Sequence, residues 1–135
     1  MPSDGPPYQP FQQWAMRAEP VFPSPLGILI HPDYGLWHGY RGALLFEDRV
    51  VLPATVGASS PCDACPGRPC LSACPVSAFD GTAYDVPVCR AHLRSGQGEA
   101  CLGGSCLARR ACPVGVEYVY GESHARFHMA AFLGG

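Results

Sequence analysis

The residues best able to do chemistry in this sequence are eight cysteines, and all of them lie between Cys62 and Cys112. They form two runs of four, and each run ends in a Cys-Pro pair that is itself flanked by alanine and valine. The two runs read Cys62-x2-Cys65-x4-Cys70-x3-Cys74-Pro75 and Cys89-x11-Cys101-x4-Cys106-x5-Cys112-Pro113. This spacing is typical of cysteines that ligate iron–sulfur clusters.

A cubane cluster has four iron corners, and each corner takes one thiolate. Short gaps between cysteines allow one loop to reach three corners, whereas the fourth ligand must come from a distant segment. Proline suits the position after that fourth cysteine because it has no N–H that needs a partner. Two such sets predict two [4Fe–4S] clusters.

The fourth cysteine of each run in bacterial ferredoxins ligates the cluster of the other run. Applied to this sequence, the rule predicts one ligand set for cluster 1 and one for cluster 2. Cluster 1 is expected to use Cys62, Cys65, Cys70 and Cys112, and cluster 2 to use Cys89, Cys101, Cys106 and Cys74.

Two other uses of cysteine compete with this interpretation. A disulfide scaffold requires an oxidising compartment, but the first residues show no basic and apolar pattern of a secretory signal. Structural zinc is the stronger alternative, because Cys62-x2-Cys65 has zinc-like spacing. Zinc ribbons, however, do not call for Cys-x3-Cys-Pro or for two Cys-Pro endings.

Composition sets further bounds on the function. The chain has 135 residues, a formal net charge of −2 and only 15% charged residues, so nothing in it points to a nucleic-acid or membrane surface. Its longest apolar stretches are too short to span a bilayer. Free thiols for metal binding favour a reducing compartment, and we expect a cytoplasmic protein. High Pro (15) and Gly (16) contents predict many turns and a small core that clusters would stabilise.

The elements around the cysteines can be outlined from the sequence. Residues 1–25 form a Pro-rich arm in which 11–18 can make two helical turns. Apolar runs at 26–30, 36–46 and 50–52 predict a small antiparallel β-unit, with a turn at 31–35 between the first two. These elements and those that follow suggest four units, which are 1–25, 26–58, a dicluster module at 61–116 and a C-terminal tail at 117–135.

The second half is predicted to be mainly helical. Asp85 is a candidate N-cap for a helix over 86–95, which would carry Cys89, and Gly96 would end it. Asp80-Gly81 predicts a turn. Ser123 is expected to cap a final helix over 124–133. The overall prediction is an α+β protein in which a small β-unit precedes a loop-rich, α-helical ferredoxin-like module.

Other polar residues give weaker signals. His124 and His128 lie one helical turn apart and could bind metal, but no acidic partner lies between them and no third His or Cys lies nearby in the sequence, so an ordinary, partly exposed helix face is the favoured interpretation. His31 and His38 are expected to be turn histidines. Four arginines lie close to the cysteines, either on a solvated face or as charges that raise a cluster's reduction potential. These are Arg90, Arg94, Arg109 and Arg110.

The segment from Leu26 to Trp37, followed by Cys62 to Cys74-Pro75, resembles epoxyqueuosine reductase and its relatives. The resemblance continues through Cys89-Arg90-Ala91-His92-Leu93 and the last Cys-Pro, covering about residues 26–116. In that family, clusters pass electrons to cobalamin held by an N-terminal domain. The resemblance therefore implies an electron relay towards a corrinoid, although the sequence contains neither the upstream part of that domain nor its catalytic acid.

The first function predicted is ferredoxin-type electron transfer to redox partner proteins, with no catalytic residues in this chain. The alternatives are a corrinoid-dependent reductase, or a fragment of one, and a zinc-stabilised structural module. As a carrier, the chain is expected to bury Tyr34, Trp37 and Tyr40 against its own cluster module and against Phe11 and Trp14, which would leave no room for cobalamin.

Overall fold

The computed structural model describes residues 6–51 and 57–134 of the chain. It is a small mixed α+β fold in which six α-helices and a 3₁₀ turn accompany a two-stranded sheet. The elements are α1 (Phe11–Ala18), β1 (Phe22–Pro23), β2 (Leu29–Ile30), α2 (Pro69–Ser72), α3 (Val86–Arg94), α4 (Glu99–Gly104), α5 (Leu107–Arg110), η1 (Val116–Tyr118) and α6 (Glu122–Gly134).

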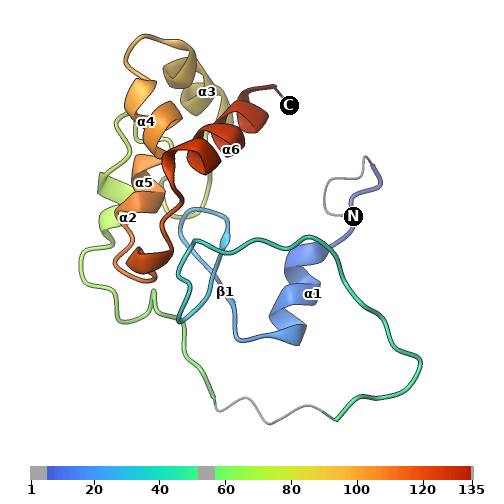
Figure 1. Cartoon of the computed structure of the whole chain (residues 1–135). Helices are drawn as coiled ribbons and strands as arrows, with labels where there is room; N and C mark the ends of the chain where they lie inside the picture. Colours follow the sequence, from blue (N-terminus) through green and yellow to red (C-terminus); the bar gives the residue numbers. More distant parts are fainter. Residues whose placement is uncertain (1–5, 52–56, 135) are drawn as a thin grey trace.

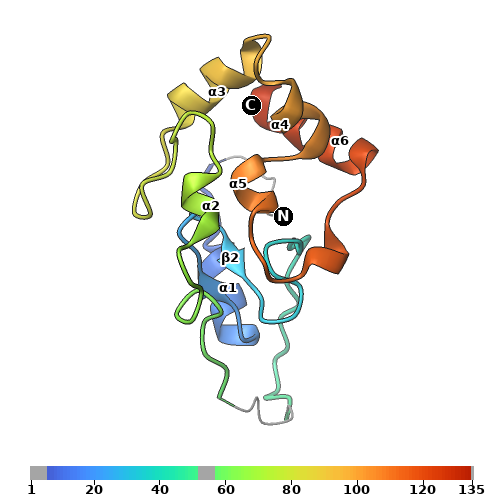
Figure 2. The same ribbon diagram turned by 90° about the vertical axis from the view of Figure 1, so that its left-hand side faces the viewer.

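Figures 1 and 2 show that the chain divides into two regions. Helices α2 to α6 lie together in one region, where α4 packs on α6 and α2 packs on α5. Helix α1 and the β1–β2 pair lie together in the other. The described part of the loop that follows β2, up to residue 51, runs past α1 and away from the helical region (Figure 1).

The predicted arm helix and cysteine-bearing helix are both confirmed. Helix α1 spans Phe11–Ala18, as the sequence indicates. The carboxylate of Asp85 accepts a hydrogen bond from the Val88 N–H and caps α3, which carries Cys89 and ends at Arg94. The Asp80 turn forms as well, because the Asp80 carboxylate accepts the Ala83 N–H at 2.6 Å. Short local signals of this kind act independently of distant contacts.

The β-unit is smaller than predicted. Only Leu29–Ile30 of the first run is a strand, and it pairs antiparallel with Phe22–Pro23. The predicted strands over 36–46 and 50–52 are wrong for the described positions, which form an open loop, while position 52 lies outside the described residues. Leu45 and Val51 are 95% and 92% exposed there. An apolar run becomes a strand only where another strand pairs with it.

The C-terminal helix also begins earlier than predicted. Ser123 lies inside α6, which starts at Glu122, and the Ala125 N–H donates to the Gly121 carbonyl. Ala125 is fully buried where α6 meets α4. The difference of two residues lies in the range over which helix starts are ordinarily uncertain from sequence. No helix among the described residues is both long and apolar enough to cross a membrane.

The main core includes the cysteines themselves. Leu26, Ile30 and Leu36 from the β region meet Phe79 and Ala108 from the helical region. Five residues of this core or its edge are predicted ligands of one cluster or the other, so the predicted metal sites and the apolar core occupy the same space. The cysteines in contact with the core are Cys62, Cys70, Cys74, Cys106 and Cys112.

Two turns join the regions through direct backbone contact. Gly35 and Gly115 both have positive φ, at +56° and +71°. A Cβ atom added to Gly35 would overlap the Val114 carbonyl, and one added to Gly115 would overlap the backbone of Tyr34. Only glycine permits both the left-handed conformation and this close approach. The contact fixes the segment that immediately follows Cys112-Pro113.

Candidate metal centres

The eight cysteines line two separate cavities, with four cysteines at each. The first cavity, here cavity 1, is lined by Cys62, Cys65, Cys70 and Cys112 together with Pro113. The second, cavity 2, is lined by Cys74, Cys89, Cys101 and Cys106 together with Pro75. This grouping has the same composition as the two sets written from the sequence, and the assignment of clusters to the sets remains a prediction.

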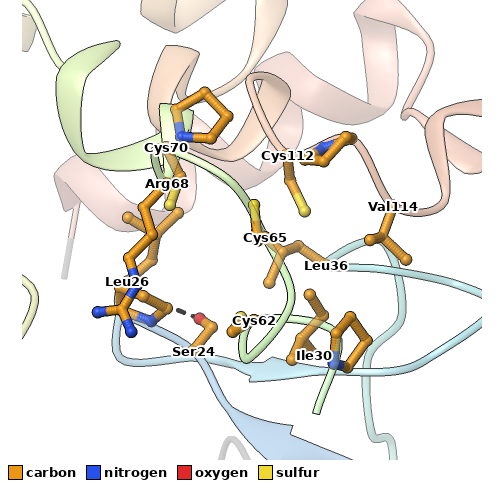
Figure 3. A pocket seen from close by; sticks show the side chains of 14 residues that line it. Ser24, Leu26, Ile30, Leu36, Cys62, Cys65, Arg68, Cys70, Cys112 and Val114 are labelled. Atoms are coloured by element: carbon orange, nitrogen blue, oxygen red, sulfur yellow. Dashed lines mark hydrogen bonds between the residues drawn. The ribbon is translucent and has the colours of Figure 1, made fainter.

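Cavity 1 is assembled from segments that are far apart in the sequence. Figure 3 shows Cys65 between Cys70, which comes from α2, and Cys112, which comes from the turn after α5. Helix α2 packs on α5, and this contact brings Cys70 close to Cys112. The opposite wall is apolar and is formed by Leu26, Ile30 and Leu36 of the β region.

The thiols of cavity 1 are close enough for electrostatic repulsion between their ionised forms to raise one another's pKa values. Burial raises the pKa of Cys62, and nearby Cys112, Cys70 and Cys65 raise it further. Burial likewise raises the pKa of Cys70, followed by Cys112 and Cys65. Thiols whose ionised forms would repel one another stay protonated until a cation binds, so the pocket is suited to a positively charged centre.

Cavity 2 lies between the helices. Its thiols come from the turn after α2, from α3, from α4 and from the start of α5. Met129 and Phe132 of α6 close one side, and its volume is about 400 Å³. Burial is the largest influence on Cys106 and raises its pKa. Two backbone N–H groups lower this pKa by a smaller amount, and the neighbouring Cys101 and Cys89 raise it slightly.

Backbone and side-chain donors point at the sulfurs. At cavity 2 the Ala78 N–H donates to the Cys74 sulfur at 3.3 Å, and the backbone N–H groups of Arg109 and Ala108 lower the pKa of Cys106. At cavity 1 the backbone N–H of Val114 lowers the pKa of Cys112. Hydrogen bonds to sulfur favour the thiolate form, which is the form that binds metal.

Two side chains at cavity 2 were not singled out from the sequence. Tyr84 lines cavity 2 together with Cys89, and burial, followed by the neighbouring Cys89, raises the pKa of Tyr84, so its hydroxyl keeps its proton. The His92 Nε2 lies 3.9 Å from the Cys101 sulfur. The sequence places both residues within five positions of Cys89, and this proximity was the signal that could have identified them as neighbours of a predicted ligand.

The donor sets and the cavities fit a four-iron cluster to different degrees. Within the described residues, no three Cys, His, Asp or Glu side chains converge tightly enough to hold a single metal ion. The thiols instead surround cavities, as the one-thiolate-per-iron arrangement of a cubane requires. Cavity 2 has both the ligands and the volume for such a group. Cavity 1 has the ligands but a volume of about 20 Å³, which is near the space of one water, so its cysteine loop must move outward to admit a cluster.

The other sequence candidates take structural positions. The His31 Nδ1 accepts the Asp33 N–H at 3.0 Å, and the His38 Nδ1 lies 3.2 Å from the Gly35 carbonyl, which agrees with turn histidines. The Nε2 atoms of His124 and His128 lie 2.9 Å apart, and Tyr120 stacks on both rings.

The four arginines near the cysteines divide into two kinds. Arg109 lines cavity 2, and its guanidinium lies 4.5 Å from the Trp37 ring and donates to the Leu36 carbonyl. Arg90 donates to the Phe132 carbonyl of α6. Arg94 and Arg110 are exposed, as expected for a solvated face.

The aromatic residues of the 34–40 segment pack only partly as expected, since Trp37 is buried but Tyr34 is 45% exposed. Tyr34 lies against Tyr118, and Trp37 lies against Tyr120, so both contact the C-terminal side of the helical region. Tyr40 packs on the small core of Ala15, Val21 and Leu29 beside α1. Phe11 and Trp14 of the same helix pack on each other.

Comparisons of this chain with protein-family models, with curated proteins and with solved structures find no match.

Proposed function

We propose that this protein is a ferredoxin-type electron carrier that holds two [4Fe–4S] clusters in a helical dicluster module. The observation that supports the proposal most directly is the separation of eight cysteines into two sets of four around two cavities. Each set combines three cysteines of one run with the closing Cys-Pro of the other, which is the arrangement used by dicluster ferredoxins. When bound, each cluster accepts and releases one electron.

The protein's own residues would hold the clusters and limit their contact with water. Thiolates from Cys62, Cys65, Cys70 and Cys112 would bind cluster 1, and those from Cys89, Cys101, Cys106 and Cys74 would bind cluster 2. The apolar walls lower the local dielectric, and the N–H groups directed at sulfur offset the negative charge. Arg109, which lines cavity 2, adds a positive charge beside that set.

Metal analysis of protein purified without oxygen tests this proposal. We expect about eight iron and about eight acid-labile sulfide per chain, since two four-iron clusters require them, together with a reversible reduction by dithionite. One or two equivalents of zinc without sulfide would refute the proposal and leave a zinc-stabilised module.

The related hypothesis of a corrinoid-dependent reductase makes a different prediction. A carrier of this kind should leave the spectrum of added cobalamin unchanged at micromolar concentration. A shift of the corrin bands in the presence of an intact two-cluster protein would move the proposal from carrier to reductase. The redox partners and the cytoplasmic location remain part of the proposal.

A further inference from the structure

Cavity 2 differs from cavity 1 in the side chains that contact its thiols. Tyr84 and Cys89 both line cavity 2, and the Nε2 of His92 is 3.9 Å from the sulfur of Cys101. At cavity 1 the corresponding side-chain contact is the Ser60 hydroxyl at Cys62. A phenol and an imidazole are thus placed beside two of the four predicted ligands of one cluster.

The position of Tyr84 is fixed by contacts that do not involve its hydroxyl. Its ring stacks on Phe79 with a centroid distance of 4.4 Å and an interplanar angle of 12°. Residues 79 and 84 also form an antiparallel bridge, and the ring of Phe132 lies 6.2 Å away on α6. Replacing the hydroxyl by hydrogen therefore removes the donor and leaves the packing of the ring intact.

His92 is held by its place on α3. It lies one helical turn from Cys89 on the same helix, and its ring lines cavity 2 between α3 and α4. Helices α3 and α4 are in contact, which brings the ring to Cys101. The two donors consequently reach ligands on two different helices.

A donor near a ligand sulfur affects the two oxidation states unequally. Reduction adds negative charge that spreads onto the sulfurs, so a hydrogen bond stabilises the reduced cluster more than the oxidised one. Each such donor raises the reduction potential. A hydrogen bond to a charged group is stronger than one to a neutral group, and the difference between the two oxidation states is a fraction of its energy.

We propose that Tyr84 and His92 are positioning residues that hold Cys89 and Cys101 and raise the reduction potential of cluster 2. This inference rests on the proposed two-cluster function.

The test is a potentiometric titration of the anaerobically purified protein, followed by electron paramagnetic resonance. The variants are Tyr84→Phe and His92→Leu, with His92→Gln to restore a donor and Tyr118→Phe as the matched control, because Tyr118 packs on Tyr34 away from the cavity. A Cys106→Ala variant assigns the cluster-2 signal. Iron and sulfide are measured first in every sample.

We expect Tyr84→Phe and His92→Leu to make reduction of cluster 2 harder by up to about tenfold in equilibrium constant, which is about 59 mV for one electron. Cluster 1 should keep its potential, His92→Gln should recover most of the shift, and Tyr118→Phe should change neither cluster. If Tyr84→Phe loses iron, the comparison of His92→Leu with His92→Gln tests the proposal. Two intact clusters with unshifted potentials in the His92→Leu and Tyr84→Phe variants would refute the tuning role alone, whereas a wild-type chain without iron would refute the proposed function.

Discussion

The backbone of Gly35 approaches the Val114 carbonyl so closely that no side chain fits between the two regions of the fold at this point. Replacing Gly35 by alanine perturbs this contact in two ways. The residue has φ +56°, so a Cβ there costs about 1–2 kcal/mol of left-handed strain. The new Cβ would also overlap the Val114 carbonyl, and the resulting backbone shift adds roughly 1–3 kcal/mol.

A matched control separates these two contributions. Gly27 has φ +74°, but a Cβ added there meets no atom within 4 Å. Gly27→Ala therefore carries the strain without the overlap. Both substitutions reduce the entropy of the unfolded chain alike, so that effect cancels between them. We expect Gly35→Ala to lower the free energy of unfolding by roughly 1–3 kcal/mol more than Gly27→Ala.

The assay is urea unfolding of both variants and the wild-type apo chain, followed by circular dichroism. In the iron-loaded protein, Gly35→Ala should also lower the iron bound by the set that includes Cys112, because Val114 lies two residues beyond that ligand. Equal destabilisation by the two substitutions would show that the close approach of the two turns does not contribute, and the account of how Cys112 is positioned would fail.

Two further predictions concern the thiols. Cys74→Ala should chiefly damage the cluster held by Cys89, Cys101 and Cys106, as seen in the resonance spectrum of the reduced protein, and selective loss of the Cys62–Cys65–Cys70 cluster would show that the pairing is local. The pKa values of Cys62, Cys70, Cys89, Cys106 and Cys112 are raised in the folded apo chain, chiefly by burial, above their ordinary value of 9.0. The protonated thiols therefore contribute stability that is complete below about pH 9 and is lost as the pH rises through their folded-state pKa values. We expect the urea midpoint of the apo chain to decrease as the pH is raised from about 8 to about 10.5. A midpoint that stays constant over this range would contradict the burial of these thiols.

The sequence was informative wherever the cause lies within a few residues. The Asp85 cap of α3 and the helix from Phe11 to Ala18 follow from local propensity and capping, and both are present. The cysteine spacing predicted two runs of four, and the crossover rule of bacterial ferredoxins predicted how the runs exchange their last cysteine. The two cavities group the cysteines in the same way.

Tertiary structure decided the features that depend on distant partners. The apolar residues from Leu44 to Val51 have strand-like composition, but strands require a neighbour, and in the described part of this segment the chain remains an open loop. The contact of Gly35 with Val114 likewise joins residues that are far apart in the sequence. The approach of His92 on α3 to Cys101 on α4 depends on how these two helices pack. The grouping of the cysteines around two cavities could therefore be predicted from the sequence, whereas the side chains near their sulfurs are set by how the helices pack.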